Sequence, residues 1–203
     1  SPESPTLYRL SLARYEGRRL VDVQTVKTGI RTISVSREHG FQLNGVSRKI
    51  KGVCLHHDLG PLGAAENKAA LIRQIKMMKA MGCDAIRTAH NMPSTMQMEL
   101  CDSLGMMVMA ESFDMWVYPK CKNGYARFFE EWADSDITNL VKHHRNHPSI
   151  IMWSIGNDPS SGARRALPSP TVCRTSATST TPRALSPRAW TGPKNPWPQV
   201  SPR

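Results

Sequence analysis

Polar side chains gather at four places in this sequence, each directly after a short apolar run. Segments with helical spacing separate the four groups, so each group would follow one strand of an alternating strand–helix chain. Histidine, arginine, asparagine and carboxylate side chains suit sugar hydroxyls and proton transfer. The groups are His56, His57 and Asp58; Arg87, His90 and Asn91; Glu111 and Asp114; and Asn157 and Asp158.

One acid in this set, Asp158, is suited to protonating a leaving oxygen, and Asn157 beside it can donate a hydrogen bond to a hydroxyl. Retaining hydrolysis of a glycosidic bond needs two carboxylates about 5 Å apart, one as acid/base and one as nucleophile. Asp158 is the candidate for the first role, and no residue stands out for the second. Trp116 and Trp153 offer apolar faces for a pyranose ring.

Plainer interpretations of these residues stay open. Polar residues also cap short loops, and Glu111 would also suit a structural pairing with Arg87 inside the fold. His143 and His147 have metal-ligand spacing on a helix, but no Glu follows His143 as in H-E-x-x-H, so a helix surface is favoured. The five cysteines form no C-x-x-C pair, so we expect no zinc site, no disulfide framework and no cofactor.

The elements that must position these groups alternate between strand and helix from residue 37 to 158. Apolar strands joined by helices predict parallel pairing, which brings the strand ends to one face of a (β/α) barrel or an open α/β sheet. On the last helix, the spacing places Phe129, Trp132, Leu140 and His144 on one face. The predicted strands are 49–54, 83–88, 106–110 and 149–155, and the predicted helices are 67–81, 94–104 and 125–144.

Two regions flank this unit. Residues 1–36 alternate apolar and polar side chains in two runs around Glu16-Gly17, which predicts two strands from the end of a β-sandwich domain that begins upstream. Residues 159–203 hold nine of the fifteen prolines and seven Lys or Arg, with no Asp or Glu. Such a composition buries too little apolar surface to offset the cost of ordering, so we predict a disordered tail.

The charge pattern argues against a nucleic-acid partner. The net charge is +11, but residues 1–158 carry 20 basic and 16 acidic side chains, and the tail offers only Trp190 and Trp197 for stacking on bases. No stretch approaches the roughly 18 apolar residues of a membrane span, so no membrane partner is expected either. No signal peptide is visible, which leaves localisation open, and an oligomer is compatible with the sequence.

A resemblance to a known family is carried by seven segments: 29–33, 41–45, 51–58, 85–91, 100–105, 110–116 and 145–157. They resemble the first half of the catalytic barrel in glycoside hydrolase family 2, and residues 1–36 are similar to the end of the immunoglobulin-like domain that precedes this barrel. The resemblance implies an α/β fold, the first half of a (β/α)8 TIM barrel preceded by the last strands of a β-sandwich. It also implies a retaining β-glycosidase that hydrolyses terminal β-galactosides, with β-glucuronidase or β-mannosidase as alternatives.

The same resemblance implies roles for individual residues. Position 158 should hold the catalytic acid/base, but the family has Asn-Glu where this chain has Asn157-Asp158. Aspartate is one methylene shorter than glutamate, and a misplacement of about 1 Å can cost about a hundredfold in rate. The family usually has Asp-Glu where this chain has Ala110-Glu111. The candidate substrate-binding residues are His56, Arg87, His90, Asn91, Glu111, Asp114, Trp116 and Asn157.

The resemblance is expected to stop directly after Asn157. Residues 159–203 contain no Glu, so we expect the nucleophile to be absent from this chain and the chain itself to be inactive. A frameshift or misplaced gene end near codon 158 would explain the change, and another reading frame should then encode Asn-Glu followed by further barrel units. The alternatives are a natural truncated paralogue, a non-catalytic sugar-binding remnant and a non-functional translation product.

Overall fold

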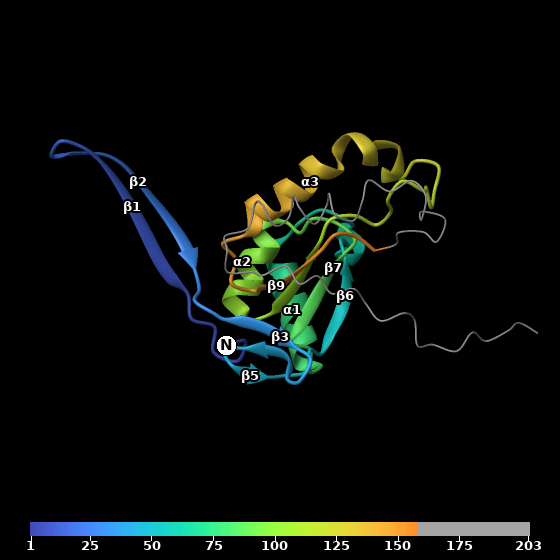
Figure 1. Cartoon of the computed structure of the whole chain (residues 1–203), viewed down its shortest axis with the longest axis horizontal. Helices are drawn as coiled ribbons and strands as arrows, with labels where there is room; N and C mark the ends of the chain where they lie inside the picture. The colour runs from blue at the N-terminus through green and yellow to red at the C-terminus, as the bar shows by residue number, and fades with distance from the viewer. Residues whose placement is uncertain (158–203) are drawn as a thin grey trace, which may run out of the picture.

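The computed structural model describes residues 1–157, which form a long hairpin, a small antiparallel sheet and a parallel sheet with helices (Figure 1). The hairpin is β1 (Tyr8–Glu16) and β2 (Arg19–Thr28), and the small sheet is β3 (Ile33–Ser36), β4 (Gly40–Leu43) and β5 (Val46–Ser47). The parallel sheet is β6 (Gly52–His56), β7 (Ala85–Ala89), β8 (Met107–Glu111) and β9 (Ile150–Ser154). The helices are α1 (Lys68–Ala80), α2 (Thr95–Leu104) and α3 (Phe129–His144), with 3-10 turns at Gly60–Leu62 and Tyr125–Phe128.

The parallel sheet confirms the predicted strand–helix alternation. Its strands pair in chain order, β6-β7-β8-β9, and every neighbouring pair is parallel. Helix and strand side chains meet in one apolar core, in which Ile75 of α1, Met98 of α2 and Leu140 of α3 are fully or almost fully buried. Consecutive parallel strands with helical crossovers are the building units of a (β/α) barrel, and β6 to β9 have this arrangement.

The helix boundaries follow from capping residues. The Asn67 side chain accepts a hydrogen bond from the Ala70 amide (3.0 Å), and the Ser94 hydroxyl accepts one from the Gln97 amide (3.1 Å). Each satisfies a backbone donor that the first helical turn leaves unpaired. At the other end of α2, Gly105 adopts φ +70°, a left-handed conformation that glycine tolerates best. The predicted helices 67–81 and 94–104 therefore match α1 and α2 to within a residue.

Helix α3 corrects one prediction, because Trp132 does not share the buried face. Its side chain is 46% exposed, whereas Phe129, Leu140 and His144 are buried as expected. A step of four residues turns a helix about 40° past a full turn, so the buried stripe drifts from Phe129 towards Ala133 and away from Trp132. The first four residues of the predicted helix 125–144 form a 3-10 turn instead of α-helix.

His144 of α3 makes the stability of this fold depend on pH. Burial, followed by the nearby His147 and His143, lowers the pKa of His144 from 6.5 to about 4. Between these values the unfolded chain binds the proton and the folded chain does not. The neutral His144 side chain therefore makes its full contribution to the free energy of unfolding above pH 6.5. This contribution is lost as the pH falls towards 4.

We expect the free energy of unfolding to fall by up to about 1.4 kcal/mol per pH unit in this window. Urea unfolding at a series of pH values measures the slope. The His144→Gln variant lacks the titrating group and should show a flatter profile. An unchanged slope in that variant would assign the pH dependence to other groups.

The small sheet β3–β5 closes the amino-terminal end of the parallel sheet, and the sequence analysis did not predict it. Leu43 of β4 packs in one cluster with Ala85, Met107 and Ile151, which lie at the starts of β7, β8 and β9. Figure 1 shows β3 and β5 at this end of the strands. Strand β3 ends at residue 36, where we placed a domain boundary, and it pairs with β4 on the other side of that boundary. The domain boundaries at residues 36 and 158 stay predictions.

The hairpin β1–β2 projects away from the barrel strands (Figure 1). Its two strands pair antiparallel around the turn at Gly17, which confirms the two strands predicted there. Apolar side chains are exposed on it, among them Leu10, Leu12 and Val23. An isolated two-stranded hairpin is marginally stable, so the assignment of these strands to a β-sandwich stays a prediction. Within residues 1–157, no helix has the length and apolar character to cross a membrane.

Candidate active site

The parallel pairing brings described members of each of the four predicted polar groups to one edge of the sheet. His56 ends β6, Glu111 ends β8, and Asn157 follows β9 by three residues. Arg87 lies on β7, and its strand neighbour in β6 is Cys54. Since the carboxyl ends of parallel strands share one edge, side chains from all four strands can interact there, as the sequence analysis expected.

A buried carboxylate, Glu111, is the centre of this edge. Its side chain has no exposed surface. Arg87 binds it with two parallel bonds, Nε to Oε2 at 2.7 Å and Nη2 to Oε1 at 2.9 Å. His90 Nδ1 lies 2.6 Å from Oε1, and the Ser154 hydroxyl donates to Oε2 at 2.6 Å. Bidentate pairing of a guanidinium with a carboxylate fixes the orientation of both groups and also stabilises their opposite charges.

A second chain of contacts leads from Arg87 to the loop that follows β8. Arg87 Nη2 donates to Asn157 Oδ1 (2.9 Å), and Asn157 Nδ2 donates to Asp114 Oδ1 (3.3 Å). Lys120 Nζ donates to the same oxygen of Asp114 (2.9 Å). The backbone N–H of Asn157 also donates to the backbone oxygen of Phe113 (2.9 Å). Asn157 is therefore held at its side chain and at its backbone.

The charges of this network are compensated within it. Burial of Arg87 acts to lower its pKa, but the hydrogen bond and charge of Glu111 outweigh burial and raise the pKa overall. The hydrogen bond from Lys120 lowers the pKa of Asp114, against a smaller opposing effect of burial. Asp114 therefore stays ionised at neutral pH and is unsuited to donating a proton, although it can accept hydrogen bonds from hydroxyls.

The remaining candidate residues differ in their exposure and in their contacts. His56 is exposed, and its ring meets that of His90 edge-on at 5.2 Å. Asn91 is exposed beside the network, and its backbone amide donates to the Thr88 oxygen (3.3 Å). Trp116 is buried (4% exposed): its ring stacks on Phe129 at 5.6 Å and lies beside Gly156, the residue before Asn157. Asp158 lies outside the described residues.

Sequence reasoning missed two hydroxyls and a lysine in this network. Ser154 contacts Glu111, and the Thr88 hydroxyl accepts a hydrogen bond from the Glu111 amide (3.0 Å). The available signal was a polar residue within an apolar strand, which Ser154 and Thr88 both provide. Lys120 lies in an irregular loop, where no periodicity points to a contact. Over residues 1–157, no group of three or more His, Cys, Asp or Glu side chains could hold a metal ion.

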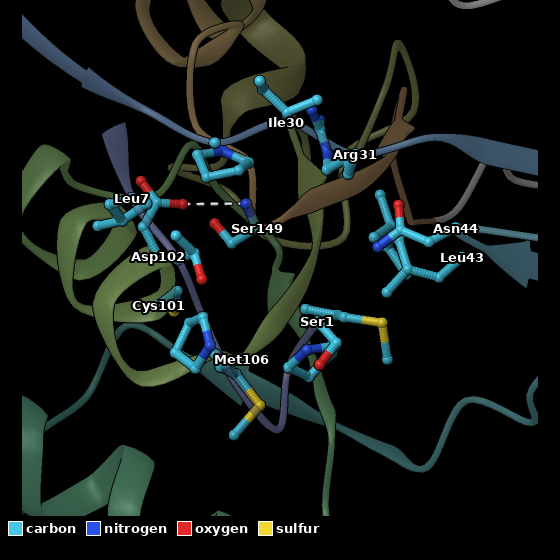
Figure 2. A pocket seen from close by; sticks show the side chains of 18 residues that line it. Ser1, Leu7, Ile30, Arg31, Leu43, Asn44, Cys101, Asp102, Met106 and Ser149 are labelled. Carbon is cyan, nitrogen blue, oxygen red and sulfur yellow. Dashed lines mark hydrogen bonds between the residues drawn. The ribbon is translucent and has the colours of Figure 1, made fainter. Parts of the chain in front are cut away.

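A cavity lies at the opposite, amino-terminal end of the sheet (Figure 2). Arg31 Nη2 donates to the Ile150 backbone oxygen there (2.7 Å), and Asp102 accepts from the Ser149 amide (2.9 Å) and contacts His147 Nδ1 (2.5 Å). These bonds join α2 and the segment before β9 to the chain after β2. None of the candidate site residues lines this cavity.

A part-barrel with a polar network at the carboxyl ends of its strands is the arrangement of TIM-barrel enzymes. The chain belongs to the glycosyl hydrolases of family 2: the family model of their TIM barrel domain matches residues 33–169. This match confirms the resemblance and runs past Asn157, where we expected it to stop.

Two curated relatives are informative. The chain is 46% identical over 156 residues to beta-galactosidase BoGH2A of Bacteroides ovatus. This match covers 77% of this chain and 18% of that enzyme. It is 41% identical to a putative beta-glucuronidase of Formosa agariphila, over 78% of this chain and 15% of that protein. The chain thus spans less than a fifth of the length of each of these relatives.

Solved structures show the same fold. A beta-glycosidase from Bacteroides vulgatus superposes with a TM-score of 0.77 at 43% identity, over 83% of this chain and 21% of that one. A family 2 member from Bacteroides cellulosilyticus gives a TM-score of 0.78 at 40% identity, over 87% of this chain and 22% of that one. Together these matches confirm the predicted fold class, part of a TIM barrel.

Proposed function

We propose that this chain is part of a retaining β-glycosidase that acts on terminal β-galactosides. The observation that carries the proposal is the network of Arg87, His90, Glu111 and Asn157 at the carboxyl ends of the strands. The relative BoGH2A, named a beta-galactosidase, supports the choice of sugar. Asn157 keeps one Nδ2 hydrogen for a ligand after its bond to Asp114, which suits a contact with the sugar 2-hydroxyl.

Proton transfer is proposed for Asp158, the residue that follows Asn157 in the sequence. The network fixes the side chain of Asn157, the residue directly before Asp158. Aspartate has a shorter reach than the glutamate of the family pattern, so Asp158 is expected to be a weak acid/base catalyst. Glu111 and Asp114 already bind cations in the network, so neither is proposed as the nucleophile.

A β-glucuronidase is the second candidate, because relatives with that name match this chain as well. A uronic acid carries a carboxylate, which needs a cation or several donors to replace its hydration. Within residues 1–157, the cations that contact this network, Arg87 and Lys120, are each paired with a carboxylate. That pairing favours a neutral galactoside over a glucuronide at this part of the site.

Ligand binding and turnover test the proposal separately. A galactose-configured iminosugar at saturating concentration should raise the melting temperature of the 203-residue chain, since binding to the folded state alone stabilises it. The glucuronate-configured analogue should raise it less. We expect no hydrolysis of an aryl β-galactoside by the chain alone, because retaining hydrolysis needs a second free carboxylate. A larger shift with the glucuronate analogue would reverse the choice of sugar, and no shift with either would argue against a sugar site.

A further inference from the structure

We propose that Glu111 is a positioning residue, which fixes Arg87 and His90 for the sugar and does not contact the sugar itself. This inference rests on the proposed function, because it concerns how the same site is organised. It also chooses between the two roles that the sequence left open, since Glu111 was both a candidate substrate-binding residue and a candidate structural partner of Arg87. The geometry around its two carboxylate oxygens carries the inference.

The carboxylate of Glu111 has no acceptor site left for a ligand. An ionised carboxylate offers about four lone-pair positions. Oε1 accepts from Arg87 Nη2 and His90 Nδ1, and Oε2 accepts from Arg87 Nε and the Ser154 hydroxyl, all within 2.9 Å. The side chain has no exposed surface. A sugar hydroxyl would have to displace one of these four donors to reach it.

The same bonds determine which atoms of His90 and Arg87 remain for a ligand. A carboxylate only accepts, so we assign a proton to His90 Nδ1, which leaves Nε2 for the sugar. Arg87 has five N–H donors; three bind Glu111 and Asn157, and Nη1 lies 3.8 Å from Cys54 Sγ. Because Nη1 also donates to Cys54 Sγ, one Nη1 hydrogen of Arg87 and the Nε2 atom of His90 remain for a ligand.

Hydroxyls from both neighbouring strands hold Glu111 in place. The Ser154 hydroxyl of β9 binds its side chain at 2.6 Å, and the Thr88 hydroxyl of β7 accepts from its backbone amide at 3.0 Å. Thr88 is itself buried. A carboxylate held from two strands transmits a fixed orientation to the groups it binds, as outer-shell partners do for metal-ligating histidines.

The protonation of His90 tests the inference without any sugar. In the 203-residue chain labelled with nitrogen-15 in its histidines, imidazole shifts at a pH well above the usual titration range report which nitrogen carries the proton. We expect the proton on Nδ1 of His90, whereas free histidine favours Nε2. A His90 proton found on Nε2 would overturn the inference.

Affinity for the galactose-configured iminosugar provides the second readout. Glu111→Gln leaves one carbonyl oxygen, which can accept from at most two of the four donors, and should weaken binding about a hundredfold. Ser154→Ala removes one donor and should weaken binding several-fold. Ser112→Ala is the matched control: its hydroxyl donates to the Ser154 backbone oxygen (3.4 Å) and does not contact Glu111, so affinity should not change.

Direct contact would give a different pattern from positioning. The sugar should move the His90 Nε2 resonance and leave the side-chain carbon of Glu111 unmoved in carbon-13 spectra. Equal weakening by Ser112→Ala and Ser154→Ala, or a large shift of the Glu111 carbon on binding, would overturn the inference. If the unmodified chain binds no iminosugar, the proposed function fails, and the His90 tautomer still decides whether Glu111 organises the network.

Discussion

Replacing Arg87 with alanine should lower the free energy of unfolding by about 3–5 kcal/mol. The side chain of Glu111 has no exposed surface, and Arg87 supplies two of its four hydrogen bonds at 2.7 and 2.9 Å. Without Arg87, a charge would stay buried with only His90 and Ser154 as partners. Breaking a buried pair on one side costs more than the pair contributes, because the remaining charge has lost its hydration. Urea unfolding measures the difference.

The matched control is the ion pair of Arg14 and Glu16 on the hairpin, whose side chains are 71% and 61% exposed at a separation of 3.3 Å. Arg14→Ala should change the free energy of unfolding by less than about 1 kcal/mol, since water screens an exposed pair. Similar losses for Arg87→Ala and Arg14→Ala would show that Glu111 is not the buried centre of the site.

Gly156→Ala should also have a large effect, on sugar binding more than on the rest of the fold. Gly156 has φ +148°, where L side chains are rare, and a Cβ added there would meet Trp116 Nε1 at 2.2 Å. Trp116 is packed on Phe129, so its ring cannot move freely. The strand end would shift and carry Asn157 away from Arg87. We expect a loss of iminosugar affinity of about a hundredfold, the size associated with a displacement of about 1 Å.

Gly17→Ala separates this clash from backbone strain. Gly17 also has a positive φ, +62°, but no atom lies within 4 Å of an added Cβ. The hairpin turn should lose about 1 kcal/mol in stability, and iminosugar affinity should stay unchanged. If Gly156→Ala retains full affinity, then the packing of Trp116 does not control the position of Asn157.

The sequence predicts α1 and α2 to within a residue because capping residues determine their boundaries, whereas the strand predicted at 49–54 is observed at Gly52–His56 and α3 begins at Phe129. Asn67 and Ser94 are capping residues that begin helices, and Gly105 ends one in the left-handed conformation. The short apolar runs between these capping residues predict buried strands. The same logic brings His90 and Glu111 to one edge, because parallel strands end together.

The remaining features depend on register and packing, which no local pattern specifies. The short sheet β3–β5 forms because its apolar side chains cover the starts of the barrel strands, as Leu43 does. Trp132 lies outside the buried stripe of α3, although its spacing of three residues from Phe129 is compatible with the same face. The bond from Ser154 to Glu111 requires the pairing of these two residues between β8 and β9. That pairing was not foreseeable from either strand alone.

A titration of the nitrogen-15-labelled chain with the galactose-configured iminosugar tests the central claim most directly. If the sugar site lies at the carboxyl ends of the strands, the resonances of His90 and Asn157 should move together and saturate with one affinity. Those of Arg31 and Ser149, which line the cavity at the opposite end of the sheet, should stay unchanged (Figure 2). Shifts confined to Arg31 and Ser149, with His90 and Asn157 unmoved, would contradict the account.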